Sequence, residues 1–126
     1  MRVGAYIAVV GASQPSQSQE RAAEEVGRLL GEAGAIVITG GRGGVMAAAS
    51  RGAAQMGATV VGILPGTNRQ DANQWVSVAL ATGLGELRNG LVVRAADAVI
   101  AVGGAYGTLS EIALALAAGT FVVGVD

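Results

Sequence analysis

The sequence predicts a single α/β domain in which helices cover both faces of one doubly wound, mostly parallel, Rossmann-like sheet. Two observations predict this fold class. Short apolar runs rich in Val and Ile alternate with longer segments of helical periodicity, and glycine-rich loops directly follow several of the runs. A length of 126 residues suits one domain, and no repeat or linker divides residues 1–126.

Six apolar runs are predicted strands. Each is about five residues long and continuous rather than alternating in its apolar character, which is typical of strands buried on both faces of a parallel sheet. The run that begins at Val76 is weaker than the others. In chain order, the predicted strands are Ala5–Val10, Ala35–Thr39, Thr59–Leu64, Val76–Leu80, Ala98–Val102 and Phe121–Val125.

Helical segments lie between the strands. The first is predicted by a stripe of apolar side chains at Ala22, Val26, Leu29, Leu30 and Ala33, which recur at the spacing of one helix face. Further helices are expected at about Val45–Met56, Glu86–Ala95 and Leu109–Ala118. The longest polar loop, Pro65–Asn73, is the candidate for a mobile rim.

The last predicted strand, Phe121–Val125, has no helix after it. A parallel sheet is normally covered on both faces. We therefore expect either that a partner subunit covers this strand, in a homodimer or a higher homo-oligomer, or that the native chain continues beyond Asp126.

The composition excludes several reaction classes. The chain has no His and no Cys, and all eight of its basic residues are Arg, so Lys is absent as well. Zinc sites built on Cys or His, thiol nucleophiles and serine–histidine pairs are therefore excluded. A Walker A lysine and a lysine Schiff base to pyridoxal phosphate are excluded for the same reason. We expect no cofactor to be required for chemistry.

Charge and hydropathy bound the partners. The net charge is −1 with 13% charged residues, so the chain has no basic surface for nucleic acid. No apolar run approaches the ~20 residues that a membrane helix needs. We expect a cytoplasmic protein whose partner is a small molecule.

Glycine-rich loops indicate where that molecule binds. Gly11 and Ser13 follow the first strand, Gly40–Gly44 leads into the second helix, and Gly103–Thr108 leads into the last helix. In open α/β sheets, ligands bind outside the carboxyl ends of the strands, and free amides at a helix N-terminus suit a phosphate. The alternative is that these glycines only make turns. The predicted binding residues are Gly11, Ser13, Gly41, Arg42, Gly43, Gly44, Gly104, Gly107 and Thr108.

Neither glycine loop matches G-x-G-x-x-G, and no acidic residue is placed to bind a ribose hydroxyl, so a standard NAD site is not expected. A mononucleotide or another phosphorylated small molecule fits the remaining features.

Three side chains are candidates for chemistry. Thr108 and Glu111 have the spacing of a capping box, with Thr108 as N-cap, or they place a hydroxyl beside a phosphate and a carboxylate in the crevice. Arg88 reads either as a solvated arginine at a helix start, which spacing alone favours, or as an anion ligand. Arg42, within the first loop, is the other arginine placed to meet an anion.

Motifs along most of the chain resemble the LONELY GUY / "possible lysine decarboxylase" superfamily. In order they are Gly40-Gly41-x-Gly43-Gly44-Val45-Met46, Ile63-Leu64-Pro65-Gly66, Arg88-Asn89, Ala96-Asp97-Ala98 and Gly107-Thr108-x-x-Glu111. The resemblance implies a Rossmann-like phosphate-binding fold, with Arg88 and Glu111 as catalytic residues and Gly107 and Thr108 as phosphate ligands. Its characterised enzymes are phosphoribohydrolases that cut the N-glycosidic bond of nucleoside 5′-monophosphates. A pyridoxal-phosphate-dependent lysine decarboxylase is not expected, because the chain has no Lys.

This chain departs from the enzymes' P-G-G-x-G-T-x-x-E motif. Gly103-Gly104-Ala105 stands where they have Pro-Gly-Gly, and Asn89 replaces the lysine that follows their arginine. The departures resemble the branch that contains molybdenum cofactor carrier proteins and uncharacterised bacterial homologues. They favour a binding or carrier protein for a nucleotide or a molybdopterin-type cofactor, with the phosphoribohydrolase as the alternative and an interaction domain as a third hypothesis.

Overall fold

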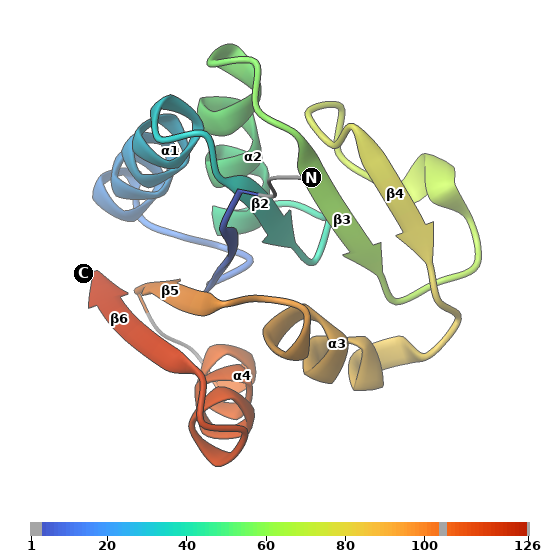
Figure 1. Ribbon diagram of the computed structural model, residues 1–126. Coiled ribbons are helices and arrows are strands. Elements are labelled where there is room, and N and C mark those ends of the chain that lie inside the picture. The colour runs from blue at the N-terminus through green and yellow to red at the C-terminus, as the bar shows by residue number, and fades with distance from the viewer. Residues whose placement is uncertain (1–3, 104–105, 126) are drawn as a thin grey trace.

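In a computed structural model, six parallel strands form one sheet with the order β4-β3-β2-β1-β5-β6 (Figure 1). The structure describes residues 4–103 and 106–125, with the backbone alone for 106–110. The strands are β1 (Tyr6–Gly11), β2 (Ile36–Thr39), β3 (Val60–Leu64), β4 (Val78–Ala81), β5 (Ala98–Val102) and β6 (Phe121–Val125). The predicted α/β class with a parallel sheet is confirmed.

Four α-helices and two short 3₁₀ turns connect the strands. The helices are α1 (Gln17–Glu32), α2 (Val45–Gln55), α3 (Arg88–Arg94) and α4 (Tyr106–Ala117), and the 3₁₀ turns are η1 (Arg69–Asp71) and η2 (Gly85–Leu87). The helix expected from Glu86 is thus a 3₁₀ turn followed by a short α-helix. The helix expected from Leu109 begins earlier, at Tyr106.

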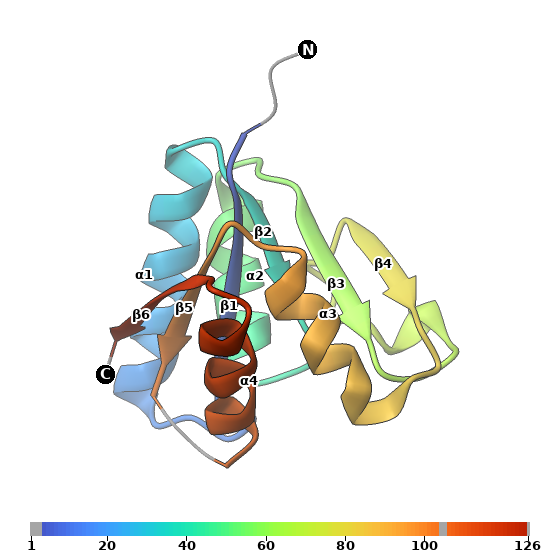
Figure 2. The ribbon, with the colours of Figure 1, turned by 60° about the horizontal axis from the view of Figure 1, so that its bottom comes forward.

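The helices form one layer on each face of the sheet (Figure 2). On one face, α1 and α2 bury Val9, Val37 and Val102 together with their own small residues. On the other, α3 and α4 cover Val10 and Ile38. Because successive strand residues point to opposite faces, uninterrupted Val and Ile runs supply both cores, as the sequence predicts.

The chain builds the sheet outward from β1 to β4 and then crosses back to place β5 on the other side of β1. β1 and β5 are in register from Ile7 opposite Ala98 to Gly11 opposite Val102, so their carboxyl ends are level. Such a switch in strand order marks the edge of the sheet at which ligands bind in α/β folds, beyond the carboxyl ends of β1 and β5.

Two glycines allow α1 and α2 to pack closely. A Cβ atom at Gly27 would overlap the carbonyl oxygen of Ala49, and a Cβ at Gly52 would overlap that of Glu24. Arg51 of α2 crosses this contact and donates from Nε and Nη2 to the Glu24 carboxylate at 3.2 and 3.0 Å. Small residues therefore determine the distance between the two helices.

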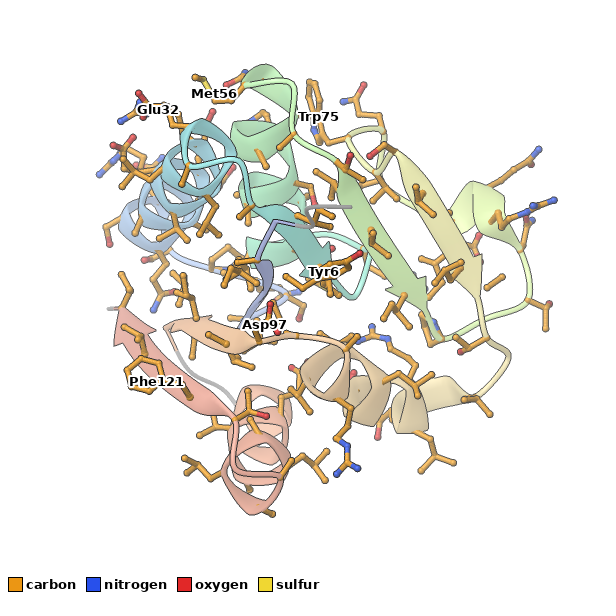
Figure 3. All side chains as sticks on the ribbon, viewed as in Figure 1. Tyr6, Glu32, Met56, Trp75, Asp97 and Phe121 are labelled. Atoms are coloured by element: carbon orange, nitrogen blue, oxygen red, sulfur yellow. The ribbon has the colours of Figure 1, made fainter. Side chains whose placement is uncertain are left out.

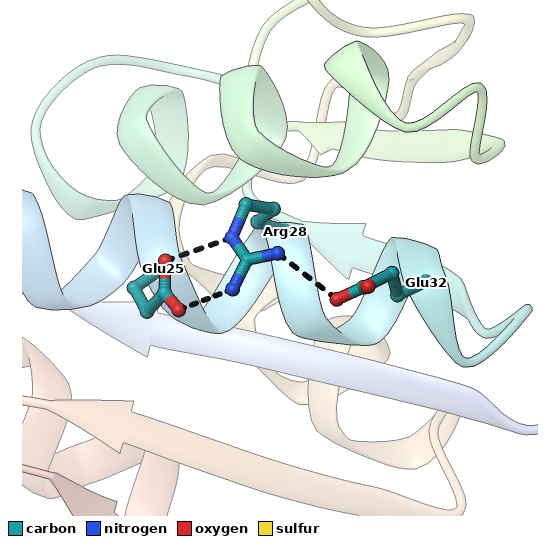
Figure 4. A network of polar contacts seen from close by, with 3 residues as sticks. All are labelled: Glu25, Arg28 and Glu32. Carbon is teal, nitrogen blue, oxygen red and sulfur yellow. Dashed lines mark hydrogen bonds and ion pairs between the residues drawn. The ribbon is translucent and has the colours of Figure 1, made fainter.

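The exposed face of α1 carries a separate charge network, in which Arg28 lies between Glu25 and Glu32 (Figure 4). These side chains are half-exposed at the i, i+3 and i, i+4 spacings of one helix. Water screens such pairs, so they support the helix only weakly.

Asp97 joins the amino ends of β1 and β5 (Figure 3). Its backbone N–H donates to the Tyr6 carbonyl at 2.7 Å, and its carboxylate accepts from the Tyr6 N–H at 2.9 Å. The Ala96-Asp97-Ala98 segment therefore has a role in the sheet, at the end remote from the glycine loops.

Along the edge strand β6, Phe121 and Val123 are exposed, with Phe121 69% accessible (Figure 3). The cover expected for this strand stays a prediction. Within the described part of the chain, no helix has the length and apolar character needed to cross a membrane.

Candidate functional site

A cavity of about 370 Å³ lies at the carboxyl ends of β1 and its neighbours. Small-molecule sites commonly occupy roughly 300–1,000 Å³, so this cavity suits a compact ligand. Its walls come from β1, the loop after it, the starts of α2 and α3, the loop after β3, and α4. The lining residues are Val9, Val10, Gly11, Ala12, Ser13, Gly40, Met46, Pro65, Glu86, Arg88, Asn89 and Glu111.

The loop after β1 fits closely against the start of α2. A Cβ at Gly11 would overlap the Val102 carbonyl oxygen and would lie 2.7 Å from a methyl carbon of Val45. The Ala12 carbonyl accepts a hydrogen bond from the Val45 N–H at 3.0 Å. Only glycine fits at position 11, and Ser13 is left exposed at the rim of the cavity.

The loop before α2 contains two residues with positive φ, Gly41 at 79° and Gly44 at 68°. The Thr39 hydroxyl accepts from the Gly41 N–H at 3.0 Å. Asn73 then holds the loop from outside: its N–H donates to the Gly41 carbonyl at 2.8 Å, and its Nδ2 donates to the Arg42 carbonyl at 2.9 Å. The loop is therefore preorganised by groups outside the cavity.

The N-terminus of α2 has no side-chain cap. Gly44 occupies the N-cap position, and its lack of a side chain leaves the first helical amides without a side-chain acceptor. Among the described residues, none accepts a hydrogen bond from the N–H of Gly43 or Gly44. Free amides and the positive end of a helix dipole at one place are suited to an anion.

Arg88 turns into the cavity from the first position of α3. Its Nη1 donates to the Asn89 side-chain oxygen, and a Cβ at Gly40 would lie 2.8 Å from its Cζ. Its Nε is buried and has no hydrogen-bond partner in the described part of the protein. Burial lowers the pKa of this guanidinium, a shift that the negative charge of Glu111 opposes. The interpretation of Arg88 as a solvated surface arginine is wrong.

Glu111 reaches the same cavity from α4 and is 8% exposed. Burial raises the pKa of its carboxyl to about 7, while the nearby positive charge of Arg88 partly opposes that rise. The ion pairs among the described residues involve other arginines, so Arg88 and Glu111 do not neutralise each other by direct contact.

The structure brings together four of the predicted site residues, since Gly11, Ser13, Arg88 and Glu111 all line the cavity. The glycine loop adjoins the cavity through Gly40 and contains four more of the predicted residues, Gly41, Arg42, Gly43 and Gly44. Arg42 is exposed but close enough for its charge to lower the pKa of Arg88.

The remaining predictions concern the loop after β5. Gly104 lies outside the described residues, as does the side chain of Thr108. The backbone of Gly107 and Thr108 belongs to the first turn of α4, which begins at Tyr106. Thr108 is therefore not the N-cap, and the predicted capping box is wrong.

Three residues that shape the site were not predicted from the sequence. Asn73 lies in a polar loop that has no periodic pattern. Met46 and Pro65 form apolar walls of the cavity and occur in the family motifs, but their side chains carry no functional group that would predict a role. In the parts of the chain that the structure describes, no group of three or more acidic side chains could hold a metal ion.

Comparison with known proteins agrees with this architecture. The chain is 44% identical over 113 residues to an uncharacterized protein of Archaeoglobus fulgidus, covering 90% of this chain and 74% of that one. Two solved structures are also similar over their common length.

The first is a molybdenum cofactor binding protein from the phototrophic bacterium Rippkaea orientalis, with 37% identity and a TM-score of 0.95 over 98% of this chain and 77% of that one. The second is the molybdenum cofactor carrier protein of Chlamydomonas reinhardtii, with 35% identity and a TM-score of 0.92 over 97% and 76% of the two chains. A family model, described as the SLOG cluster4 family, matches residues 4–126. With nearly its whole length matched, the chain belongs to the SLOG cluster4 family.

Proposed function

We propose that the protein binds a phosphorylated small molecule, a nucleotide or a molybdopterin-type cofactor, in the cavity beside β1 and carries it intact. The observation that carries the proposal is the Arg88 guanidinium, which belongs to a side chain that lines the cavity and whose buried Nε has no hydrogen-bond partner among the described residues. A buried donor without a partner costs about 1–3 kcal/mol, and a bound ligand that accepts its hydrogen bond removes that cost.

The loops supply the rest of the anion site. The free amides of Gly43 and Gly44, with Arg42 beside them, are suited to the phosphate. Gly107 and Thr108, in the first turn of the helix α4 that also carries Glu111, are proposed to contribute as further phosphate ligands. A molybdopterin-type cargo carries a phosphate on a flat heterocycle, and the apolar walls from Val9, Val10 and Met46 suit such a ring.

The similar proteins support the same class of ligand, since two of them are a molybdenum cofactor binding protein and a molybdenum cofactor carrier protein. The cofactor is cargo in this proposal, and no catalytic step is assigned to it. Asn89 bears on the same choice, because its amide oxygen holds Arg88 Nη1 where the related hydrolases have a second cation.

Thermal unfolding with a panel of ligands tests the proposal. GMP, AMP and 6-hydroxymethylpterin monophosphate are compared with their dephosphorylated forms, because a ligand that binds only the native state raises Tm. We expect at least one phosphorylated compound to raise Tm by several degrees and its dephosphorylated form to do so less. Arg88→Gln removes the rise and Arg69→Gln, an exposed arginine in η1, retains it. The proposal fails if no phosphorylated compound raises Tm.

A second candidate function rests on Glu111. A buried carboxyl with a pKa of about 7 beside a positive charge is the kind of group that glycoside-cleaving enzymes use as an acid, and the alternative is a nucleoside 5′-monophosphate phosphoribohydrolase. Incubation with AMP separates the two functions. Free adenine and ribose 5-phosphate from the wild type, absent with Glu111→Ala, would establish the hydrolase. We expect AMP to remain intact.

A further inference from the structure

Glu111 is the one charged residue that is buried among the described residues. Folding alone does not account for it, because burying a carboxylate costs several kcal/mol unless a paired charge and hydrogen bonds compensate. Arg88 is near enough to influence its titration but makes no ion pair with it. A buried acid that the fold does not need is a candidate for ligand recognition.

Arg88 supplies hydrogen-bond donors that complement the acceptor oxygens of Glu111. The Asn89 side-chain oxygen accepts from Nη1, and Gly40 lies against the same nitrogen. The Nε N–H has no partner among the described residues, and Arg88 lines the cavity. In the lining of the cavity, Glu111 thus offers acceptors, its carboxylate oxygens, and Arg88 offers donors, its remaining N–H groups.

Building on the proposed function, we propose that Glu111 and Arg88 together select a ring with a 2-amino-4-oxopyrimidine edge, the edge shared by pterins and guanine. The Glu111 carboxylate accepts two hydrogen bonds, from the ring N–H and from the adjacent exocyclic amine. Arg88 donates from its guanidinium to the carbonyl oxygen beside that N–H. The three ring groups run in the order acceptor, donor, donor, so Arg88 meets the first and Glu111 the other two.

Other common rings match less well. Adenine has a ring nitrogen lone pair where the N–H should be, which would face the carboxylate, and it has no carbonyl oxygen for Arg88. Hypoxanthine keeps the carbonyl and the ring N–H but lacks the amine. A phosphate beside Glu111 would be repelled while the carboxylate is charged, so the ligand's phosphate is directed to the loop with Gly43 and Gly44 instead.

The test compares the affinities of GMP, IMP and AMP by isothermal titration calorimetry at pH 8, where the Glu111 carboxyl is ionised. GMP and IMP differ only in the exocyclic amine. A hydrogen bond to a charged group is worth about ten- to hundredfold in affinity, so GMP is expected to bind that much more tightly than IMP, and AMP more weakly still. A further arm with 6-hydroxymethylpterin monophosphate shows whether a pterin or guanine is the preferred source of this edge.

Glu111→Gln is the decisive variant. Its amide has one acceptor oxygen and presents N–H groups where the second acceptor was. The affinities of the variant for GMP and IMP should therefore differ by no more than about threefold. Glu32→Gln makes the same change on the exposed face of α1 and keeps the wild-type preference. A structural role for Glu111 would weaken both nucleotides equally.

The outcomes separate the two proposals. If GMP, IMP and AMP bind with equal affinity, or if Glu111→Gln leaves the preference unchanged, the ring selection is overturned while phosphate binding stands. If none of the four phosphorylated compounds binds, the proposed function itself fails.

Discussion

Arg88 and Glu111 reach one cavity from different helices, carry opposite charges and make no ion pair with each other. Burial disfavours the charged form of both groups, and each charge partly compensates the other. This arrangement is costly in the protein alone, and a ligand that hydrogen-bonds to both groups would relieve the cost.

The stability of the protein should depend on pH through Glu111. Its pKa is about 7 in the folded state, against 4.5 for an ordinary glutamate, so between these values the folded state binds more protons than the unfolded state. The free energy of unfolding therefore falls as pH rises from about 4.5 to 7, by on the order of 3 kcal/mol from this group.

Chemical denaturation at pH 5 and pH 8 measures this effect. At pH 8, Glu111→Gln should be more stable than the wild type. Its free energy of unfolding should differ much less between pH 5 and pH 8 than that of the wild type does. Glu32→Gln, at an exposed position, should change with pH as the wild type does. A Glu111→Gln protein that is less stable than wild type at pH 8 would contradict the burial argument.

The glycine loop offers a matched pair of substitutions. A Cβ at Gly44 would lie 2.5 Å from the Ala12 carbonyl oxygen and 2.6 Å from that of Ser13, at a φ of 68°. Gly44→Ala should therefore destabilise the fold by about 1–3 kcal/mol in urea titrations. At Gly43 no atom lies within 4 Å, so Gly43→Ala should fold normally.

The same two variants distinguish an effect on phosphate binding from an effect on stability. Gly43→Ala is expected to weaken GMP binding at unchanged stability, because the added methyl stands where backbone and phosphate would meet. Wild-type affinity in Gly43→Ala would show that the phosphate does not bind at this loop.

Asn73 should matter for binding although it does not line the cavity. Asn73→Ala removes the bond from Nδ2 to the Arg42 carbonyl and loosens the loop, at a cost of about 1 kcal/mol in stability and a several-fold loss of GMP affinity. Asn68→Ala is the control, since Asn68 caps η1 through the Gln70 N–H. Equal losses of affinity in both variants would show that the contact with Arg42 has no special role.

The packing of α1 on α2 gives a prediction independent of the site. Gly52→Ala places a Cβ against the Glu24 carbonyl oxygen and should destabilise the protein by about 1–3 kcal/mol. Gly90→Ala, in α3 with nothing within 4 Å, should stabilise it by about 0.5–1 kcal/mol. Urea titrations measure both, and similar changes in the two variants would refute the close helix contact.

The sheet could be predicted from the sequence because its signal is local. Runs such as Ala98–Val102 are apolar at every position, as strands between two helical layers must be. The position of the crevice followed from glycine loops after the strands. The start of the last helix could not be predicted as well, because Thr108-x-x-Glu111 has the spacing of a capping box, whereas the helix runs back to Tyr106.

The site was predictable only in part. The spacing around Arg88 does not say which face of a seven-residue helix turns inward, and composition favours a solvated arginine. The burial of Glu111 depends on contacts between α4 and strands distant in sequence. Asn73 supports the glycine loop across 31 residues, a relationship that no local pattern contains.

Native mass spectrometry of the protein with GMP or 6-hydroxymethylpterin monophosphate tests most directly whether the cavity holds a phosphorylated small molecule and leaves it intact. We expect one intact ligand on each chain, retained over hours without release of free guanine, and no adduct with Arg88→Gln. Absence of an adduct with both compounds, or free guanine that accumulates with the wild type and not with Glu111→Ala, would overturn the proposal that the protein binds such a ligand and leaves it intact.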